Sequence, residues 1–167
     1  MLRLYGGTGL SPQELLSWAL ARDIGLDRLP EIRRTEHGKP YFPALPRLHV
    51  NWSHSGPFLL CALGDAPVGV DLEVIRPRSA ALPRYALTAL EYARYQRDGA
   101  DWPAFYTLWT RKEAWCKYTG QGLRRLWGED IPTTGLFLRS YQGPTWRAAL
   151  CSEEEAPAAI HWKEETP

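Results

Sequence analysis

Apolar residues recur at helical spacing in several stretches of the chain. They predict helices over residues 12–23, 80–85, 88–97 and 102–119. The first helix has the clearest end signals, because Ser11, Pro12 and Glu14 form a capping-box sequence with proline at the first helical position. Gly25 then stops this helix. Short-range rules therefore predict both of its ends.

The helix predicted over residues 102–119 carries charges on and beside its apolar face. Asp101 is its N-cap and Gly120 ends it. Glu113 and Lys117 are one turn apart at the edge of the face, with Cβ atoms roughly 5–6 Å apart. A surface ion pair alone would also explain them. Lys112 falls near the middle of the apolar face, where an unpaired ammonium is unfavourable, so we expect an anion beside it.

Short apolar or alternating stretches predict the strands. They cover residues 32–35, 48–52, 58–63, 68–74, 136–141, 145–151 and 158–163. Residues 2–5 predict a short edge strand or a frayed terminus. In the stretch 68–74, a period of two places Asp71 and Glu73 on one face, with Cα atoms about 6.6 Å apart. Such a face is either a solvated surface or a pair of oxygen ligands for a hard cation.

Length, charge and cysteine usage narrow the classes of protein. At 167 residues the chain can bury a sizeable core as one compact unit. A net charge of +1 gives no extended basic surface, so we expect no nucleic-acid partner. No stretch approaches the roughly 20 apolar residues of a membrane span, and the first residues lack a signal-peptide pattern. Cys61, Cys116 and Cys151 lack metal-ligand spacing. We therefore expect a cytoplasmic protein with no membrane partner.

Five motifs follow one another along the chain. They are GKPY at 38–41, WSHSG at 52–56, GVDLE at 69–73, LEY at 90–92 and LWTRKEAWCKYTGQGL at 108–123. Each motif is weakly specific alone, but in this order they make the sequence resemble the 4′-phosphopantetheinyl transferases of the surfactin-synthetase-activating (Sfp) type. The resemblance extends from about residue 37 to residue 122.

The resemblance implies an α+β fold of two similar α/β halves, packed as a pseudo-twofold dimer within one chain. Residues 1–75 would form the half with the coenzyme A site and the metal strand. Residues 76–167 would form the half with the catalytic helix, and the site would lie in the cleft between the halves. Family members carry several dozen more residues before the first helix, so the first half is expected to be truncated. The candidates for replacing the basic residues of that segment are Arg3, Arg22, Arg33 and Arg34.

The resemblance also implies a reaction. Phosphopantetheine would pass from coenzyme A to a serine of an apo acyl carrier protein or peptidyl carrier domain, with Mg²⁺, and adenosine 3′,5′-bisphosphate would leave. Asp71, Glu73 and Glu113 would hold the metal, and Glu113 would also accept the serine proton. The expected catalytic residues are Glu113, Lys117 and His54. Coenzyme A would be bound by Glu113 and Lys117 together with residues of the first two motifs: His37, Gly38, Lys39, Pro40, Tyr41, Phe42, Ser53 and His54.

Two other functions stay open at the level of the sequence. One is a homologue that binds coenzyme A or a carrier protein without catalysis, and the other is a metal-dependent phosphodiesterase that uses the same acids. Two residue roles are open as well. Glu91 matches an acid that the family places near the metal, and it also completes a capping box with Thr88. Lys112 matches a family lysine that contacts either a phosphate or an internal carboxylate.

Overall fold

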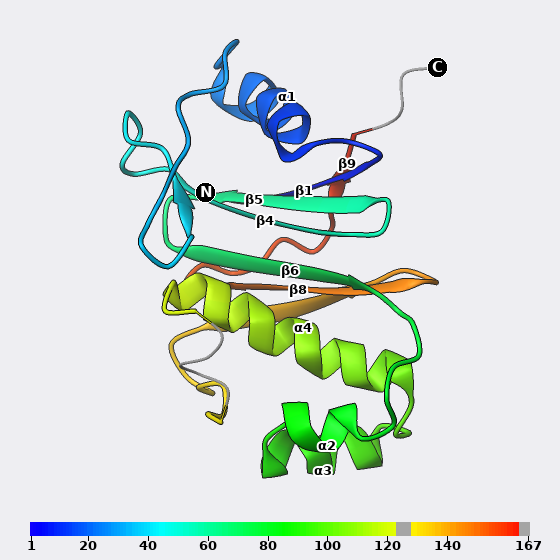
Figure 1. Cartoon of the computed structure of the whole chain (residues 1–167). Helices are drawn as coiled ribbons and strands as arrows, with labels where there is room; N and C mark the ends of the chain where they lie inside the picture. Colours follow the sequence, from blue (N-terminus) through cyan, green and yellow to red (C-terminus); the bar gives the residue numbers. More distant parts are fainter. Residues whose placement is uncertain (123–127, 164–167) are drawn as a thin grey trace.

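The computed structural model of the chain describes residues 1–122 and 128–163. Its elements are stacked as helix, sheet, sheet and helix, with the two sheets facing each other at the centre (Figure 1). Three apolar clusters fill the spaces between these layers. On β5, Leu59 faces the first helix and its neighbour Leu60 faces the second sheet. The alternation of a strand thus supplies two separate cores.

Helix α1 (Pro12–Ile24) covers the outer face of the larger sheet. The predicted capping box joins Ser11 and Glu14, and Gly25 ends the helix in the left-handed region at φ 74°. Its buried residues, among them Leu16, pack against the sheet. The prediction for this helix is confirmed because its end signals are local.

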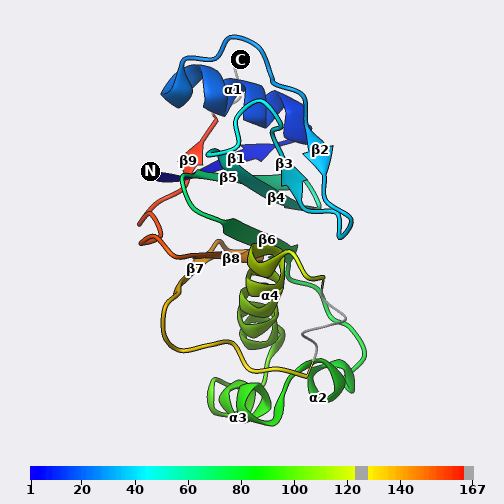
Figure 2. The same cartoon turned by 90° about the vertical axis from the view of Figure 1, so that its left-hand side faces the viewer.

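Helix α4 (Trp102–Thr119) lies along the outer face of the smaller sheet. It begins at the predicted N-cap Asp101 and ends at Gly120, which has φ 69°. Two shorter helices, α2 (Leu82–Ala86) and α3 (Ala89–Arg97), lie on the far side of α4 (Figure 2). No helix in the described part of the chain combines the length and apolar character needed to cross a membrane.

The larger sheet contains strands from both ends of the chain. They are β1 (Leu2–Thr8), β2 (Arg33–Arg34), β3 (Pro40–Tyr41), β4 (His49–Ser55), β5 (Phe58–Gly64) and β9 (His161–Trp162). Their order across the sheet is β2-β3-β4-β5-β1-β9. The prediction that the first strand is an edge strand or frayed is wrong, because β1 pairs with β5 on one side and with β9 on the other.

The smaller sheet consists of β6 (Val68–Val74), β8 (Trp146–Ser152) and β7 (Phe137–Gln142), which pair antiparallel in that order. Pairing crosses the expected boundary at residue 75 twice. Strand β6 precedes the boundary and pairs with β8, whereas β9 follows it and pairs with β1. Trp162 of β9 packs directly on β1, because its ring occupies the place that a side chain at Gly6 would take. The pseudo-twofold relation of the halves stays a prediction.

Helix α4 lies in direct contact with β6 at Gly69. A Cβ atom at this position would lie 2.1 Å from the carbonyl oxygen of Ala114 and 2.2 Å from the amide nitrogen of Tyr118. The backbone of the helix therefore rests directly on the strand, where any side chain would separate them. This backbone contact determines how far Glu113 and Lys117 lie from β6.

Candidate active site

Strand β6 presents two acids on the side away from the core between the sheets. Its apolar residues Val70 and Leu72 fill that core, so Asp71 and Glu73 lie on the opposite face. Asp71 is buried, and its Oδ1 accepts a hydrogen bond from Lys117 Nζ at 2.7 Å. The lysine of α4 thus pairs with an acid of β6, 46 residues away in the chain. Burial raises the pKa of Asp71, whereas Lys117 acts in the opposite direction.

Glu113 lies close to the same acids. Burial raises its pKa from 4.5 to about 7, and the negative charges of Asp71 and Glu73 act in the same direction. Burial followed by the charge of Asp71 likewise raises the pKa of Glu73. The carboxylates of Asp71, Glu73 and Glu113 therefore lie close enough for the charge of one to change the pKa of another. A carboxyl that titrates near neutral pH is suited to exchange protons with a substrate.

Replacing this acid should change how stability depends on pH. Since the pKa of Glu113 is about 7 in the folded protein and 4.5 as the reference value, the folded protein holds this proton more tightly. The free energy of unfolding therefore falls as the pH rises through this window. We expect Glu113→Gln to abolish this loss, so that its stability relative to wild type rises between pH 4.5 and 8 by at most about 3 kcal/mol.

Urea unfolding at both pH values, in a chelating buffer, measures this difference. The matched control is Glu129→Gln, since Glu129 is exposed. The control should keep the same difference from wild type at both pH values. An equally constant difference for Glu113→Gln would contradict the assignment of a raised pKa to Glu113.

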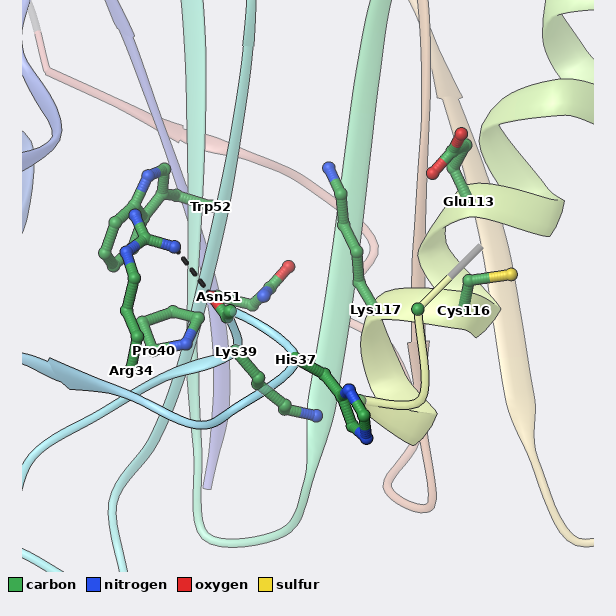
Figure 3. A pocket seen from close by; sticks show the side chains of 12 residues that line it. Arg34, His37, Lys39, Pro40, Asn51, Trp52, Glu113, Cys116 and Lys117 are labelled. Atoms are coloured by element: carbon green, nitrogen blue, oxygen red, sulfur yellow. Dashed lines mark hydrogen bonds between the residues drawn. The ribbon is translucent and has the colours of Figure 1, made fainter. Parts of the chain in front are cut away.

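A pocket of about 220 Å³ opens beside Glu113, between the C-terminal end of α4 and the loop before β3. Figure 3 shows the residues across it, with Arg34 and Trp52 on one side, Lys39 and Lys117 in the middle and Glu113 on the other. Basic side chains thus line one side and the middle of the pocket, and the carboxylate of Glu113 lies on the other side. Such a pocket suits a ligand that carries several phosphates and reacts near the acidic end.

Lys39 connects the GKPY loop to the end of α4. Its Nζ donates a hydrogen bond to the backbone oxygen of Tyr118 and lies 5.7 Å from the centre of that aromatic ring. Burial lowers the pKa of Lys39 to about 8. Its aliphatic stem also lies against Gly120, where an added Cβ would be 3.1 Å from Lys39 Cδ. A cation is therefore held at the carbonyl end of the helix, which favours positive charge.

The acids have the chemistry of a site for a hard divalent cation. Carboxylate oxygens are the ligands that Mg²⁺ prefers, and the buried Oδ2 of Asp71 has no hydrogen-bond partner among the described residues. In the described ranges, however, no three His, Cys, Asp or Glu side chains are gathered into a coordinating group. The donor set of Asp71, Glu73 and Glu113 fits such an ion in chemical type, and the side chains are not arranged as a finished coordination shell.

Comparison with known proteins identifies the family. The profile of the 4′-phosphopantetheinyl transferase superfamily matches residues 67–165, which include β6 and α4. The chain belongs to this superfamily. The predicted resemblance of the sequence to these transferases is therefore confirmed, and the matched range contains three of the five motifs.

Individual members of the superfamily are also similar to the chain. The 4′-phosphopantetheinyl transferase Sfp of Bacillus subtilis (strain 168) is 36% identical over 134 residues, which are 77% of this chain and 56% of that protein. Another Bacillus subtilis 4′-phosphopantetheinyl transferase is 38% identical over 112 residues, or 65% of this chain and 50% of that protein. For the transferase AcpT of Salmonella typhi, the identity is 39% over 146 residues, covering 81% and 76%. The chain spans about half the length of the two Bacillus subtilis relatives.

In this superfamily member, part of the predicted coenzyme A set lines the pocket. His37, Gly38, Lys39 and Pro40 do so together with Glu113 and Lys117. The other predicted residues lie elsewhere. Phe42 is fully buried in the core beneath α1, and Tyr41 is 40% exposed. His54 is exposed and does not line the pocket, so its predicted catalytic and binding roles stay predictions.

Ser53 lies one residue before His54 on β4, and its side chain is turned the other way. It is buried, and its Oγ donates a hydrogen bond to Asp71 Oδ1 at 3.0 Å. In this structure Ser53 therefore contacts the predicted metal strand. Its predicted role in binding coenzyme A stays a prediction.

Sequence reasoning left the basic side of the pocket open among four arginines, and only Arg34 of these lines it. Its guanidinium carbon lies 5.1 Å from the centre of the Trp52 ring, and its Nη1 donates to the backbone oxygen of Gly38 at 2.7 Å. Arg33 bonds Glu31 instead. The short hairpin of β2 and β3 sets Arg34 opposite Pro40. Lys39 in the turn of this hairpin bonds the end of α4, 79 residues away in the chain, and this contact had no signal in the sequence. Asn51, Trp52 and Cys116 are further lining residues that were not predicted.

Glu91 has the structural role that the sequence left open. Its carboxylate closes the capping box of α3 with Thr88, and its Oε2 accepts a hydrogen bond from Lys112 Nζ at 2.8 Å. Both side chains of this pair are buried. The anion expected beside Lys112 is therefore an internal carboxylate. A buried pair of this kind fixes α3 against α4.

Proposed function

We propose that this chain transfers the 4′-phosphopantetheine arm of coenzyme A to a serine hydroxyl of an apo acyl carrier protein or peptidyl carrier domain. The observation that carries the proposal is the pairing of Lys117 with Asp71, because it joins the family's acid strand to its catalytic helix beside a basic pocket. The family membership of the chain supports the same reaction class.

The pocket suits the charges of coenzyme A. Its pyrophosphate would lie near Lys117, whose side chain is 30% exposed and available to an anion. Its 3′-phosphate would lie toward the basic wall formed by Arg34, His37 and Lys39. Guanidinium and ammonium groups are strong donors to phosphate oxygens. The reacting phosphorus would then be close to the acids of β6 and α4.

The chemical step is a displacement at the phosphorus that carries the pantetheine arm. The serine Oγ forms a bond to this phosphorus while the bond to the bridging oxygen of the pyrophosphate breaks. Adenosine 3′,5′-bisphosphate leaves with the electron pair of that bond. Glu113 accepts the serine proton, and Lys117 stabilises the charge on the leaving phosphate.

Asp71, Glu73 and Glu113 would hold a Mg²⁺ ion in this reaction. The ion would neutralise phosphoryl charge and align the attacking and leaving oxygens. Its presence would also favour the ionised form of the three carboxylates. Free, buried Cys61, Cys116 and Cys151 are consistent with a reducing compartment, and we place the reaction in the cytoplasm.

The decisive experiment is intact-mass analysis of an apo carrier protein incubated with the chain, coenzyme A and Mg²⁺. We expect a gain of roughly 340 Da on the carrier, the mass of the phosphopantetheine arm transferred with metal assistance. Omission of Mg²⁺ should prevent the gain. Coenzyme A binding without any gain on several carriers would contradict the proposal and favour a non-catalytic binding protein.

Replacement of the proposed base gives a second test. We expect Glu113→Gln to lower turnover by about 100-fold or more, because a positioned base contributes roughly 10²–10⁴ to such rates. Coenzyme A binding, measured by calorimetry, should change much less, since the amide keeps the shape of the side chain. Equal losses of turnover and binding would argue against Glu113 as the base.

A further inference from the structure

Strands β4 and β6 run side by side but belong to different sheets (Figure 2). Strand β6 pairs with β8 on one side only, and none of the described strand pairings joins it to β4. Alternate polar side chains of β4 span the junction instead. The first is Asn51, whose Oδ1 accepts a hydrogen bond from the backbone nitrogen of Val70 at 3.0 Å. This bond fixes the register of β6 against β4.

The second of these side chains is Ser53, which contacts Asp71. Its hydroxyl and Lys117 Nζ both donate to the same oxygen, Oδ1, at 3.0 and 2.7 Å. The other oxygen, Oδ2, is buried and has no partner in the described part of the chain. A carboxylate oxygen with free lone pairs is therefore held in a fixed direction. An unpaired buried oxygen is unfavourable, which is the state that a bound cation relieves.

The third side chain is Ser55, whose hydroxyl orients Glu73 as that of Ser53 orients Asp71. Its Oγ lies 3.0 Å from the backbone nitrogen of Val74 and 2.9 Å from Glu73 Oε2. The backbone N–H can only donate and an ionised carboxylate can only accept. The single proton of the hydroxyl must therefore point to Glu73. The backbone N–H of Val74 on β6 thereby orients the Ser55 hydroxyl, and this hydroxyl in turn holds the side chain of Glu73 on the same strand.

We propose that Ser55 is a positioning residue for a divalent cation: with Ser53, it sets the acids of β6 in place before the ion arrives. Ser55 is 7% exposed and Ser53 is 8% exposed, so both hydroxyls contact the acids from the buried side and are shielded from solvent. The inference rests on the proposed function, because a site for a cation is what the two acids would serve. Groups that orient ligands in this way commonly change metal affinity by 10–100-fold when they are replaced.

The test is Mn²⁺ binding, measured by titration calorimetry on the full chain without coenzyme A or carrier. We expect Ser55→Ala to weaken Mn²⁺ binding by about 10-fold, and Ser53→Ala to weaken it by a similar factor. Ser55→Thr, which keeps the hydroxyl, should recover most of the affinity. Ser17→Ala on α1 is the matched control and should bind like wild type, because Ser17 lies on the far side of the larger sheet.

Thermal unfolding separates positioning from a general structural role. The inference requires weaker Mn²⁺ binding by variants that unfold cooperatively at or near the wild-type temperature. Wild-type affinity in both Ser55→Ala and Ser53→Ala would overturn it and leave the proposed function standing. Absence of Mn²⁺ binding by the wild-type chain would overturn both the inference and the metal requirement. If Ser55→Ala does not fold, Ser53→Ala and Ser55→Thr decide.

Discussion

Gly69→Ala is expected to lower the free energy of unfolding by about 3 kcal/mol, the upper end of the usual range for overpacking. The added methyl group would meet the backbone of α4 at 2.1 Å from the oxygen of Ala114 and 2.2 Å from the nitrogen of Tyr118. Side chains can rotate away from such a collision, but a helix backbone cannot. The helix must therefore move outward as a unit.

This movement should also reduce transfer activity. Lys117 and Glu113 are attached to the displaced helix, whereas Asp71 remains on β6. Urea unfolding and the intact-mass assay measure the two effects. Gly128→Ala is the matched control, since an added Cβ there has nothing within 4 Å among the described atoms. An unchanged unfolding midpoint and rate for Gly69→Ala would contradict the role of this contact.

Asp71→Asn should lower transfer by at least about 1000-fold, which corresponds to roughly 4 kcal/mol of transition-state stabilisation. The amide keeps the shape of the carboxylate but removes the charge that would face the cation and that pairs with Lys117. Lys117 can reach water, because its side chain is 30% exposed, so the fold should persist. Circular dichroism and the intact-mass assay distinguish lost chemistry from lost structure.

The matched control for Asp71→Asn is Asp27→Asn. Asp27 is exposed in the loop after α1 and does not line the pocket. This variant should transfer at the wild-type rate. A wild-type rate for Asp71→Asn itself would overturn the proposed role of Asp71 as a metal ligand.

Local rules account for the elements that carry the site. The predicted bounds of β6 and α4 are the observed ones, because alternation, an aspartate N-cap and a C-terminal glycine act within a few residues. The buried position of Lys112 likewise required an anion, and Glu91 supplies it. These features depend on helical and strand periodicity, which any stretch of chain carries in its own sequence.

Long-range pairing decided the features that sequence reasoning missed or misjudged. The strand at the end of the chain joins β1 in the other sheet, so β1 has neighbours on both sides. Of the four candidate arginines, Arg34 lines the pocket, because the end of α4 lies beside the short hairpin of β2 and β3. Neither outcome has a local signal, since each depends on which distant element packs beside the strand or the hairpin.

The sequence by itself determined the candidate residues for the chemistry: two acids on one face of β6, and an acid and a lysine one turn apart on α4. Only the tertiary structure decided how they meet. It placed Lys117 on Asp71, turned Ser53 and Ser55 toward the acids, and set the distance between strand and helix at Gly69. Periodicity fixes the face on which a side chain lies, whereas its partner is fixed by the packing of elements far apart in the chain.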